Sequence, residues 1–113
     1  MTDNYIHDIS VEFRAGAAIT AAFPKHMNIC NNEVYSTAYS SVHTGWGWGS
    51  KAESGTVNLN INNNYLHKIL NTIMFDGGAI YTLGHTGGSL DNLNEMCGNY
   101  CYDIGNMFGV LYP

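Results

Sequence analysis

Charged residues are scarce in this chain. Asp, Glu, Lys and Arg make up 12% of its 113 residues, against about 25% in an average soluble domain. Only four residues are basic, and the formal net charge is −5. A nucleic-acid partner is therefore not expected, because a phosphate-tracking surface needs clustered Lys and Arg. Asn, Gly, Ser, Thr and Tyr fill the gap, a composition that suits stacked strands better than amphipathic helices.

Long apolar runs, paired cysteines and metal-ligand patterns are also missing. No apolar segment approaches the roughly 18 residues of a membrane-spanning helix, so no membrane span is expected. The three cysteines are an odd number that cannot all pair within the chain, and we interpret them as buried, reduced thiols. No grouping of His, Cys, Asp and Glu has the spacing of a metal site, so we expect neither a metal nor another cofactor.

What the chain does have is a fourfold repeat. An asparagine precedes a short apolar-aromatic segment four times, at Asn4, Asn32, Asn64 and Asn99. The intervals of 28, 32 and 35 residues are typical of a solenoid with variable loops. Asn tolerates the left-handed backbone of a tight corner, and Asn side chains stacked from one repeat to the next can form a ladder of amide hydrogen bonds.

Each repeat contains three segments that predict short strands. One ends at the asparagine, one follows it, and one of small residues comes after a loop, centred on Ile19, Val42, Ile80 and Leu111. Alternation of apolar and polar residues, ended by Asn or Gly, is typical of half-buried strands. Residues 66–73 also have helical spacing, but the equivalent segments of the other repeats do not, which favours a strand followed by a loop there. We predict a right-handed parallel β-helix of about four coils with incomplete ends, forming one partial domain over residues 1–113.

Three segments carry a resemblance to a known family. They are Asn-Tyr-Ile-His-Asp-Ile-Ser-Val-Glu-Phe-Arg-Ala-Gly at 4–16, Gly-Trp-Gly-Trp-Gly at 45–49 and Asp-Gly-Gly-Ala-Ile-Tyr-Thr-Leu-Gly at 76–84. In this order they resemble the bacterial right-handed parallel β-helix proteins of the pectate-lyase-like superfamily, including secreted polysaccharide-degrading members such as glycoside hydrolase family 141. The resemblance implies hydrolysis of O-glycosidic bonds in a polysaccharide or oligosaccharide, and a secreted, cell-surface or periplasmic location.

The same resemblance implies that the chain is a fragment. Relatives commonly continue after Leu-Tyr-Pro with an acidic Asp-Glu pair, and this chain ends at Pro113. One catalytic carboxyl is thus expected beyond Pro113, so the 113 residues alone are expected to be inactive. We also expect self-association through the open ends of the β-helix.

Asp76 is the leading catalytic candidate. It follows the apolar residues 73–75, which would favour the protonated carboxyl that a general acid requires, and it precedes two glycines that let a backbone approach a ligand. The alternative is an Asp that caps a turn. Hydrolysis needs a second carboxyl, and the candidates within the chain are Glu12, Glu33, Glu53, Asp91 and Glu95. For Glu12, a role in substrate contact competes with an ion pair to Arg14.

Aromatic side chains are the candidate sugar-binding groups. Trp46 and Trp48 alternate with glycines, which places both rings on one face of a strand. Exposed aromatic area of this kind typically marks a binding site, and packing beneath the loop at 51–57 is the alternative. The third strands should also stack about 4.8 Å apart, which predicts an outward-facing polar column of Thr20, His43, Tyr81 and Tyr112.

Four of the five histidines fall into two groups. His43 belongs to the polar column, and His85 follows the third-strand segment at the mouth of a loop. Both are candidates for substrate binding, although an ordinary surface role is the alternative for each. His7 and His67 occupy a repeated position that Tyr35 and Tyr102 fill in the other repeats. We interpret that position as structural.

Two functions from different classes remain open. The first is a glycoside hydrolase with Asp76 as acid or base, and the second is a non-catalytic β-helix segment that binds glycan or serves as scaffold. A polysaccharide lyase is a third reading. The fold cannot decide among them, because one solenoid hosts many activities.

Overall fold

The structure, a computed structural model, describes residues 1–47, 55–71, 74, 76–86 and 90–105. Within this part of the chain there are ten strands and no helix, and hence no helix that could cross a membrane. The strands are β1 (Tyr5–Ile9), β2 (Ile19–Ala21), β3 (Lys25–Cys30), β4 (Glu33–Thr37), β5 (Val42–Gly45), β6 (Val57–Asn62), β7 (Tyr65–Ile69), β8 (Ile80–Leu83), β9 (Glu95–Cys97) and β10 (Tyr100–Ile104).

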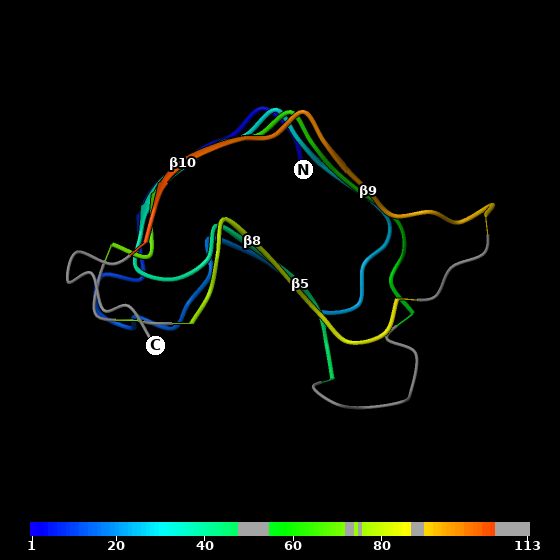
Figure 1. The fold of residues 1–113 in the computed structure, drawn as a ribbon, viewed down its shortest axis with the longest axis horizontal. Helices are drawn as coiled ribbons and strands as arrows, with labels where there is room; N and C mark the ends of the chain where they lie inside the picture. The colour runs from blue at the N-terminus through cyan, green and yellow to red at the C-terminus, as the bar shows by residue number, and fades with distance from the viewer. Residues whose placement is uncertain (48–54, 72–73, 75, 87–89, 106–113) are drawn as a thin grey trace, which may run out of the picture.

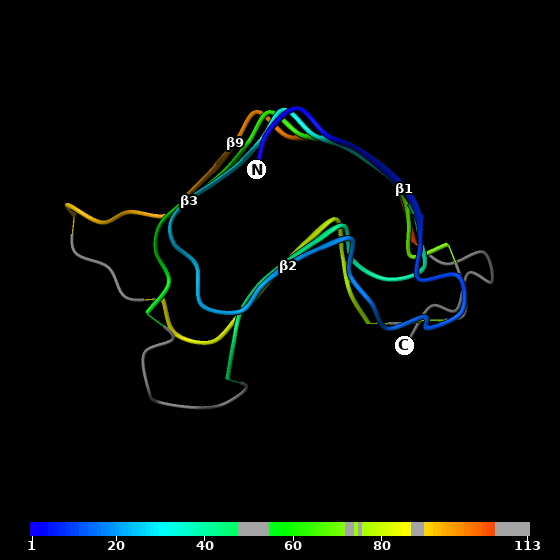
Figure 2. The same cartoon turned by 180° about the vertical axis from the view of Figure 1, so that it is seen from behind.

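The strands form three parallel sheets, in the orders β1-β4-β7-β10, β2-β5-β8 and β3-β6-β9. Each strand therefore pairs with the third strand after it along the chain, and the repeats overlie one another in Figures 1 and 2. We call β1–β3 the first repeat, β4–β6 the second and β7–β9 the third, and β10 begins the fourth. The prediction of an all-β chain of stacked parallel strands is confirmed.

The register of the sheets follows the repeat asparagines. Tyr5 pairs with Glu33, Glu33 with Tyr65, and Tyr65 with Tyr100, so the residues that follow each asparagine lie side by side. A slip of one residue would turn every inward side chain to solvent. Residues 66–69 of the segment with helical spacing belong to β7, a strand like its neighbours, which confirms the strand prediction for this part.

The core fills the space between the three sheets. Its main cluster contains Ile19, Ile29, Val34, Val42, Leu59, Ile61 and Leu66. A smaller cluster of Tyr39, Ile69 and Leu70 lies beside it. Burial of one such Leu or Ile side chain contributes about 1.5–3 kcal/mol, so these clusters supply most of the driving force for stacking the repeats.

Inward positions of β9 and β10 are exposed, unlike their equivalents in earlier repeats. Met96, Cys101 and Ile104 are exposed, whereas Ile61, Leu66 and Ile69 beneath them are fully buried. The reason is that no described strand lies over β9 or β10. All three cysteines are free, but Cys97 and Cys101 are exposed and Cys30 is half-buried, so the prediction of buried thiols is wrong.

The four repeat asparagines form the expected amide ladder. The Nδ2 atom of each donates to the Oδ1 atom of the next, over 2.8 Å from Asn4 to Asn32 and 2.9 Å in the two later steps. The backbone N–H of each donates to the same Oδ1 atom, over 3.1, 3.0 and 3.0 Å. The Oδ1 atoms of Asn32, Asn64 and Asn99 therefore accept two hydrogen bonds each.

The ladder is buried and also binds the neighbouring strands. The second Nδ2 proton of Asn64 is donated to the carbonyl of Ile29 over 2.9 Å, and Asn99 repeats this bond to Ile61 over 2.7 Å. Since Asn32 and Asn64 are only 1% and 2% exposed, water cannot replace these bonds. The residues just before the ladder have left-handed backbones, with φ of 58°, 55°, 56° and 64° at Asp3, Asn31, Asn63 and Gly98.

Substitution of a central ladder residue is expected to be strongly destabilising. Asn64→Ala removes the Oδ1 atom that accepts from both the N–H and the Nδ2 of the buried Asn32, and each buried group left without its partner costs about 1–3 kcal/mol. We expect a loss of roughly 2–5 kcal/mol in the unfolding free energy, measured by urea denaturation. Asn60→Ala, which removes an exposed amide bond to Asn28 on the outer face, is the control, with a loss within about 0.5 kcal/mol. Equal losses in the two variants would contradict the role of the ladder.

Candidate functional site

The loops that lead from the first sheet to the second differ in length. Residues 10–18 and 70–79 form long loops in the first and third repeats, and residues 38–41 form a short one between them. Figure 1 shows the described parts of the two long loops at the same side of the molecule. A hollow of about 290 Å³ is lined by residues of all three repeats: Ile9, Val11, Arg14, Ser36, Ala38 and Asn71.

Arg14 supplies the positive charge of this hollow. It is exposed, and no ion pair joins it to Glu12 among the residues that the structure describes. The ion pair considered as the alternative role of Glu12 is therefore absent. Glu12 itself is exposed in the same loop and does not line the hollow.

The outer face of β2-β5-β8 carries the predicted column. Thr20 pairs with His43, and His43 pairs with Tyr81, while Tyr112 lies outside the described residues. The His43 and Tyr81 rings meet edge to face, with centroids 5.1 Å apart. Tyr39 adds a third ring, with its centroid 6.3 Å from that of His43 and 6.2 Å from that of Tyr81. The column is thus an aromatic cluster with a polar edge.

One nitrogen in this cluster lacks a partner. The Nε2 atom of His43 is buried and makes no hydrogen bond in the described part of the chain. Buried polar atoms are nearly always hydrogen-bonded, so an exception calls for a physical explanation. The Tyr39 and Tyr81 rings both pack against this imidazole, and their own centroids are 6.2 Å apart, so the three rings form a triangular cluster.

Asp76 lies beside Tyr39 at one end of the cluster. Burial raises the pKa of the Tyr39 hydroxyl, and the negative charge of Asp76 raises it further. Asp76 itself is exposed, so the burial expected for this carboxyl is not observed, while residues 73 and 75 lie outside the described residues. The two glycines after it pack inward instead: a Cβ atom on Gly77 would lie 2.9 Å from the Tyr39 ring, and the N–H of Gly78 donates to the Ser40 hydroxyl over 3.2 Å.

Two exposed aromatic rings lie at the other end of the same strands. Trp46 is 62% exposed and Phe23 is 59% exposed, with centroids 6.4 Å apart and planes inclined by 50°. The two residues are equivalents, since each lies three positions after the paired Thr20 and His43. Gly84 takes this place in the third repeat, where any Cβ atom would clash with the carbonyl oxygen of Trp46.

We did not anticipate Phe23 as a site residue. The signal was present in the sequence, because Phe23 and Trp46 follow equivalent strands at the same interval. Trp48, the expected partner of Trp46, lies outside the described residues. We call Asp76, Tyr39, the column of Thr20, His43 and Tyr81, and the pair of Phe23 and Trp46 the aromatic strip.

The other candidate residues lie elsewhere. His85 is exposed directly after β8, and Asp91 is exposed. Glu33 contacts the Nε2 atom of His67 on the first sheet, over 3.1 Å, and Glu95 accepts a hydrogen bond from Asn62 on the third sheet, over 2.7 Å. These contacts favour structural roles for two of the possible second carboxyls. Glu53 lies outside the described residues.

The repeated His/Tyr position forms one continuous stack. His7, Tyr35, His67 and Tyr102 follow one another with centroids 5.1, 5.1 and 5.0 Å apart and planes inclined by 18°, 6° and 6°. Each inner ring covers the faces of its neighbours, so these faces are not available to a sugar. The arrangement supports the structural interpretation of this position.

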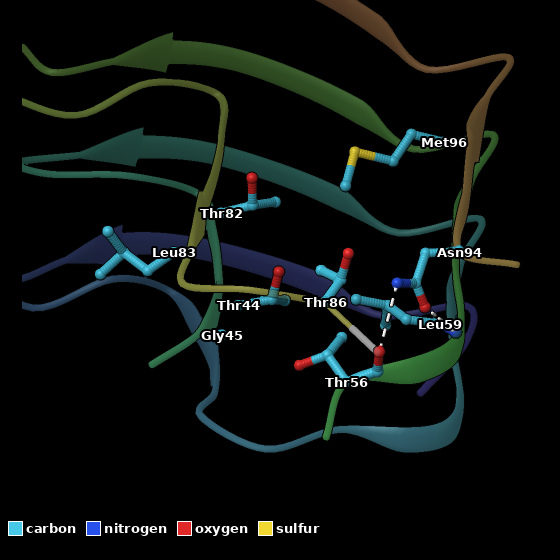
Figure 3. A pocket seen from close by; sticks show the side chains of 9 residues that line it. All are labelled: Thr44, Gly45, Thr56, Leu59, Thr82, Leu83, Thr86, Asn94 and Met96. Atoms are coloured by element: carbon cyan, nitrogen blue, oxygen red, sulfur yellow. Dashed lines mark hydrogen bonds between the residues drawn. The ribbon is translucent and has the colours of Figure 1, made fainter. Parts of the chain in front are cut away.

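A second, partly open cavity lies between the sheets that contain β5 and β6 (Figure 3). It has a volume of about 50 Å³, and its lining includes four threonines: Thr44, Thr56, Thr82 and Thr86. This volume suits water molecules held by hydroxyl groups and is too small for a sugar ring. No cluster of metal-ligating side chains exists among the described residues. The aromatic strip and the Arg14 hollow are thus the candidate surfaces for a larger ligand.

Removal of the Asp76 charge should lower the pKa of Tyr39. A nearby anion disfavours the phenolate, and Asp76→Asn removes that anion while burial of the ring continues to hold the pKa up. The direction is measurable by NMR titration of the Tyr39 ring. Asp91→Asn, in the loop before β9, is the control and should leave the titration unchanged. An unchanged Tyr39 pKa in Asp76→Asn would show that the Tyr39 hydroxyl and the Asp76 carboxylate are not close in solution.

Comparison with known proteins does not identify the chain. No family model matches it, and no curated protein or solved structure matches it either. Any assignment of function must therefore come from the residues of the site and from the sequence resemblance described above.

Proposed function

We propose that the chain is a segment of a right-handed parallel β-helix protein that binds polysaccharide along the aromatic strip. The fold proposal is supported by the pairing of every third strand, by the asparagine ladder, and by the resemblance of residues 4–16, 45–49 and 76–84 to pectate-lyase-like proteins. The same resemblance supports a secreted, cell-surface or periplasmic location.

The exposed pair of Phe23 and Trp46 is the observation that carries the proposal. Single exposed apolar side chains are common, but two adjacent exposed rings form a contiguous apolar surface, and such a surface typically marks a binding site. The C–H faces of a sugar pack on such rings. On the same strands, Thr20 and Tyr81 offer hydroxyl groups that can hydrogen-bond sugar hydroxyls, and the His43 ring packs edge to face on Tyr81. A polysaccharide matches this alternation of apolar and polar groups.

Hydrolysis of the bound glycan is the second candidate function. Asp76 supports it, because this carboxylate lies at the end of the aromatic strip beside Tyr39. A glycoside hydrolase needs two carboxyl groups, about 5 Å apart for retention of configuration or 6.5–9.5 Å for inversion. The resemblance implies that the second group belongs to an acidic pair after Pro113, so catalysis would belong to the longer protein.

Loss of either exposed ring should weaken glycan binding. Removal of one anchoring aromatic side chain typically costs about 1–2 kcal/mol, so Phe23→Ala and Trp46→Ala should each reduce affinity roughly 5- to 30-fold. Affinity electrophoresis against a panel of neutral and acidic polysaccharides would identify the ligand, and calorimetry would measure the loss. Phe13→Ala is the control, because Phe13 is 84% exposed but lies in the loop after β1. A double variant that binds as tightly as the parent would refute the proposed site.

Asp76→Asn should abolish cleavage without abolishing binding. The test uses the longer protein that contains the residues after Pro113, because the 113-residue chain alone is expected to have no turnover. Release of reducing sugar would report hydrolysis, whereas new ultraviolet absorbance at a cleaved uronate would report a lyase instead. Glu95→Gln, on another sheet, is the control and should keep full activity. Unchanged turnover in Asp76→Asn would remove this residue from the catalytic role.

A further inference from the structure

The asparagine ladder has a direction. In every step the donor belongs to one repeat and the Oδ1 acceptor belongs to the next repeat, from Asn4 through Asn32 and Asn64 to Asn99. A second series of bonds accompanies the ladder with equal regularity. The residue after each asparagine donates its backbone N–H to the backbone carbonyl of the asparagine one repeat earlier. This bond spans 2.9 Å from Glu33 to Asn4 and 2.8 Å in both later steps.

The two outermost asparagines therefore leave opposite groups unused. At Asn99 the N–H and the carbonyl oxygen face the open side of β10, and neither has a partner in the described part of the chain. At the open side of β1, the Oδ1 atom of Asn4 and the N–H of Tyr5 are likewise without partners among the described residues. The N–H of Asn99 in one copy can therefore donate to the Oδ1 atom of Asn4 in another copy. The carbonyl oxygen of the same Asn99 can accept from the N–H of Tyr5 in that second copy.

The side chains of the two edges match as well. If β1 of one copy lay on β10 of another in the register that β1 makes with β4, His7 would cover Tyr102. The stack of His7, Tyr35, His67 and Tyr102 would then continue with His and Tyr still alternating. In the same register Ile6 would cover Cys101 and Ile9 would cover the exposed Ile104.

We propose that copies of the 113-residue chain associate head to tail, with β10 of one copy pairing in parallel with β1 of the next. The symmetric alternative pairs two β10 edges antiparallel, which can satisfy main-chain groups of β10 but neither continues the ladder nor uses the Oδ1 atom of Asn4 and the N–H of Tyr5. A head-to-tail contact joins different surfaces of the two copies and does not close on itself, so it extends into linear assemblies. The association does not depend on the glycan-binding function.

Two matched proline variants test the β1 edge and the β10 edge individually. The N–H groups of Tyr5 and Cys101 point to the open sides of β1 and β10, because the peptide groups next to them bond the neighbouring strands β4 and β7. Tyr5→Pro and Cys101→Pro each remove one edge donor, and proline is tolerated on edge strands. Each variant should remain monomeric alone, because it retains only one working edge. An equimolar mixture should form a dimer and stop there.

Sedimentation velocity of the unmodified chain is the first measurement. We expect the weight-average mass to grow several-fold, past that of a dimer, as concentration rises from about 1 to about 200 µM, in line with mass action. A monomer at every concentration would overturn the proposal, as would growth that ends at a dimer. Since this measurement needs no substitution, it decides the matter even where a proline variant fails to fold. Dimers of Tyr5→Pro alone would show a symmetric contact between β10 edges and would also overturn it.

Discussion

Hydrogen bonds between buried asparagine amides hold the repeats of this chain in place. A buried amide that loses its partners costs far more than the same amide contributes when satisfied, so the ladder works mainly by excluding other arrangements. Asn32 shows how complete the satisfaction is: its Oδ1 atom accepts two bonds, and its Nδ2 atom donates to Asn64 and to the carbonyl of Met1. The parallel register, the stacking of Ile and Leu side chains and the alignment of the outer rings all follow from this one constraint.

The fold was largely predictable because the constraint is visible in the sequence. An asparagine recurs with the same apolar neighbours, and its intervals give the register of three sheets once the strands are taken to stack. Burial was harder to predict, because it depends on what lies over a side chain as well as on which way it points. Cys101 points inward like Leu66 beneath it, yet it is exposed since no described strand covers β10.

The candidate site was only partly predictable for a related reason. Side chains on strands inherit their positions from the register, so the alignment of Thr20, His43 and Tyr81 could be foreseen. Side chains on loops do not inherit a position, and Asp76 is exposed in spite of its apolar neighbours in the sequence. Phe23 could have been found by extending the strand alignment two residues past β2, where it meets Trp46. Alignment of equivalent positions was a better guide here than the composition of a single segment.

The unequal loops after β1, β4 and β7 also bear on how such a chain can change. The ladder sets the position of each strand independently of the length of the loop that precedes it, as the 4-residue loop at 38–41 and the 10-residue loop at 70–79 show within one sheet stack. Closing a longer loop costs free energy that grows only with the logarithm of its length. Insertions at these corners are therefore nearly neutral for stability, while each one reshapes the hollow that contains Arg14. These loops can therefore be exchanged, and the hollow reshaped, while the asparagines stay unchanged.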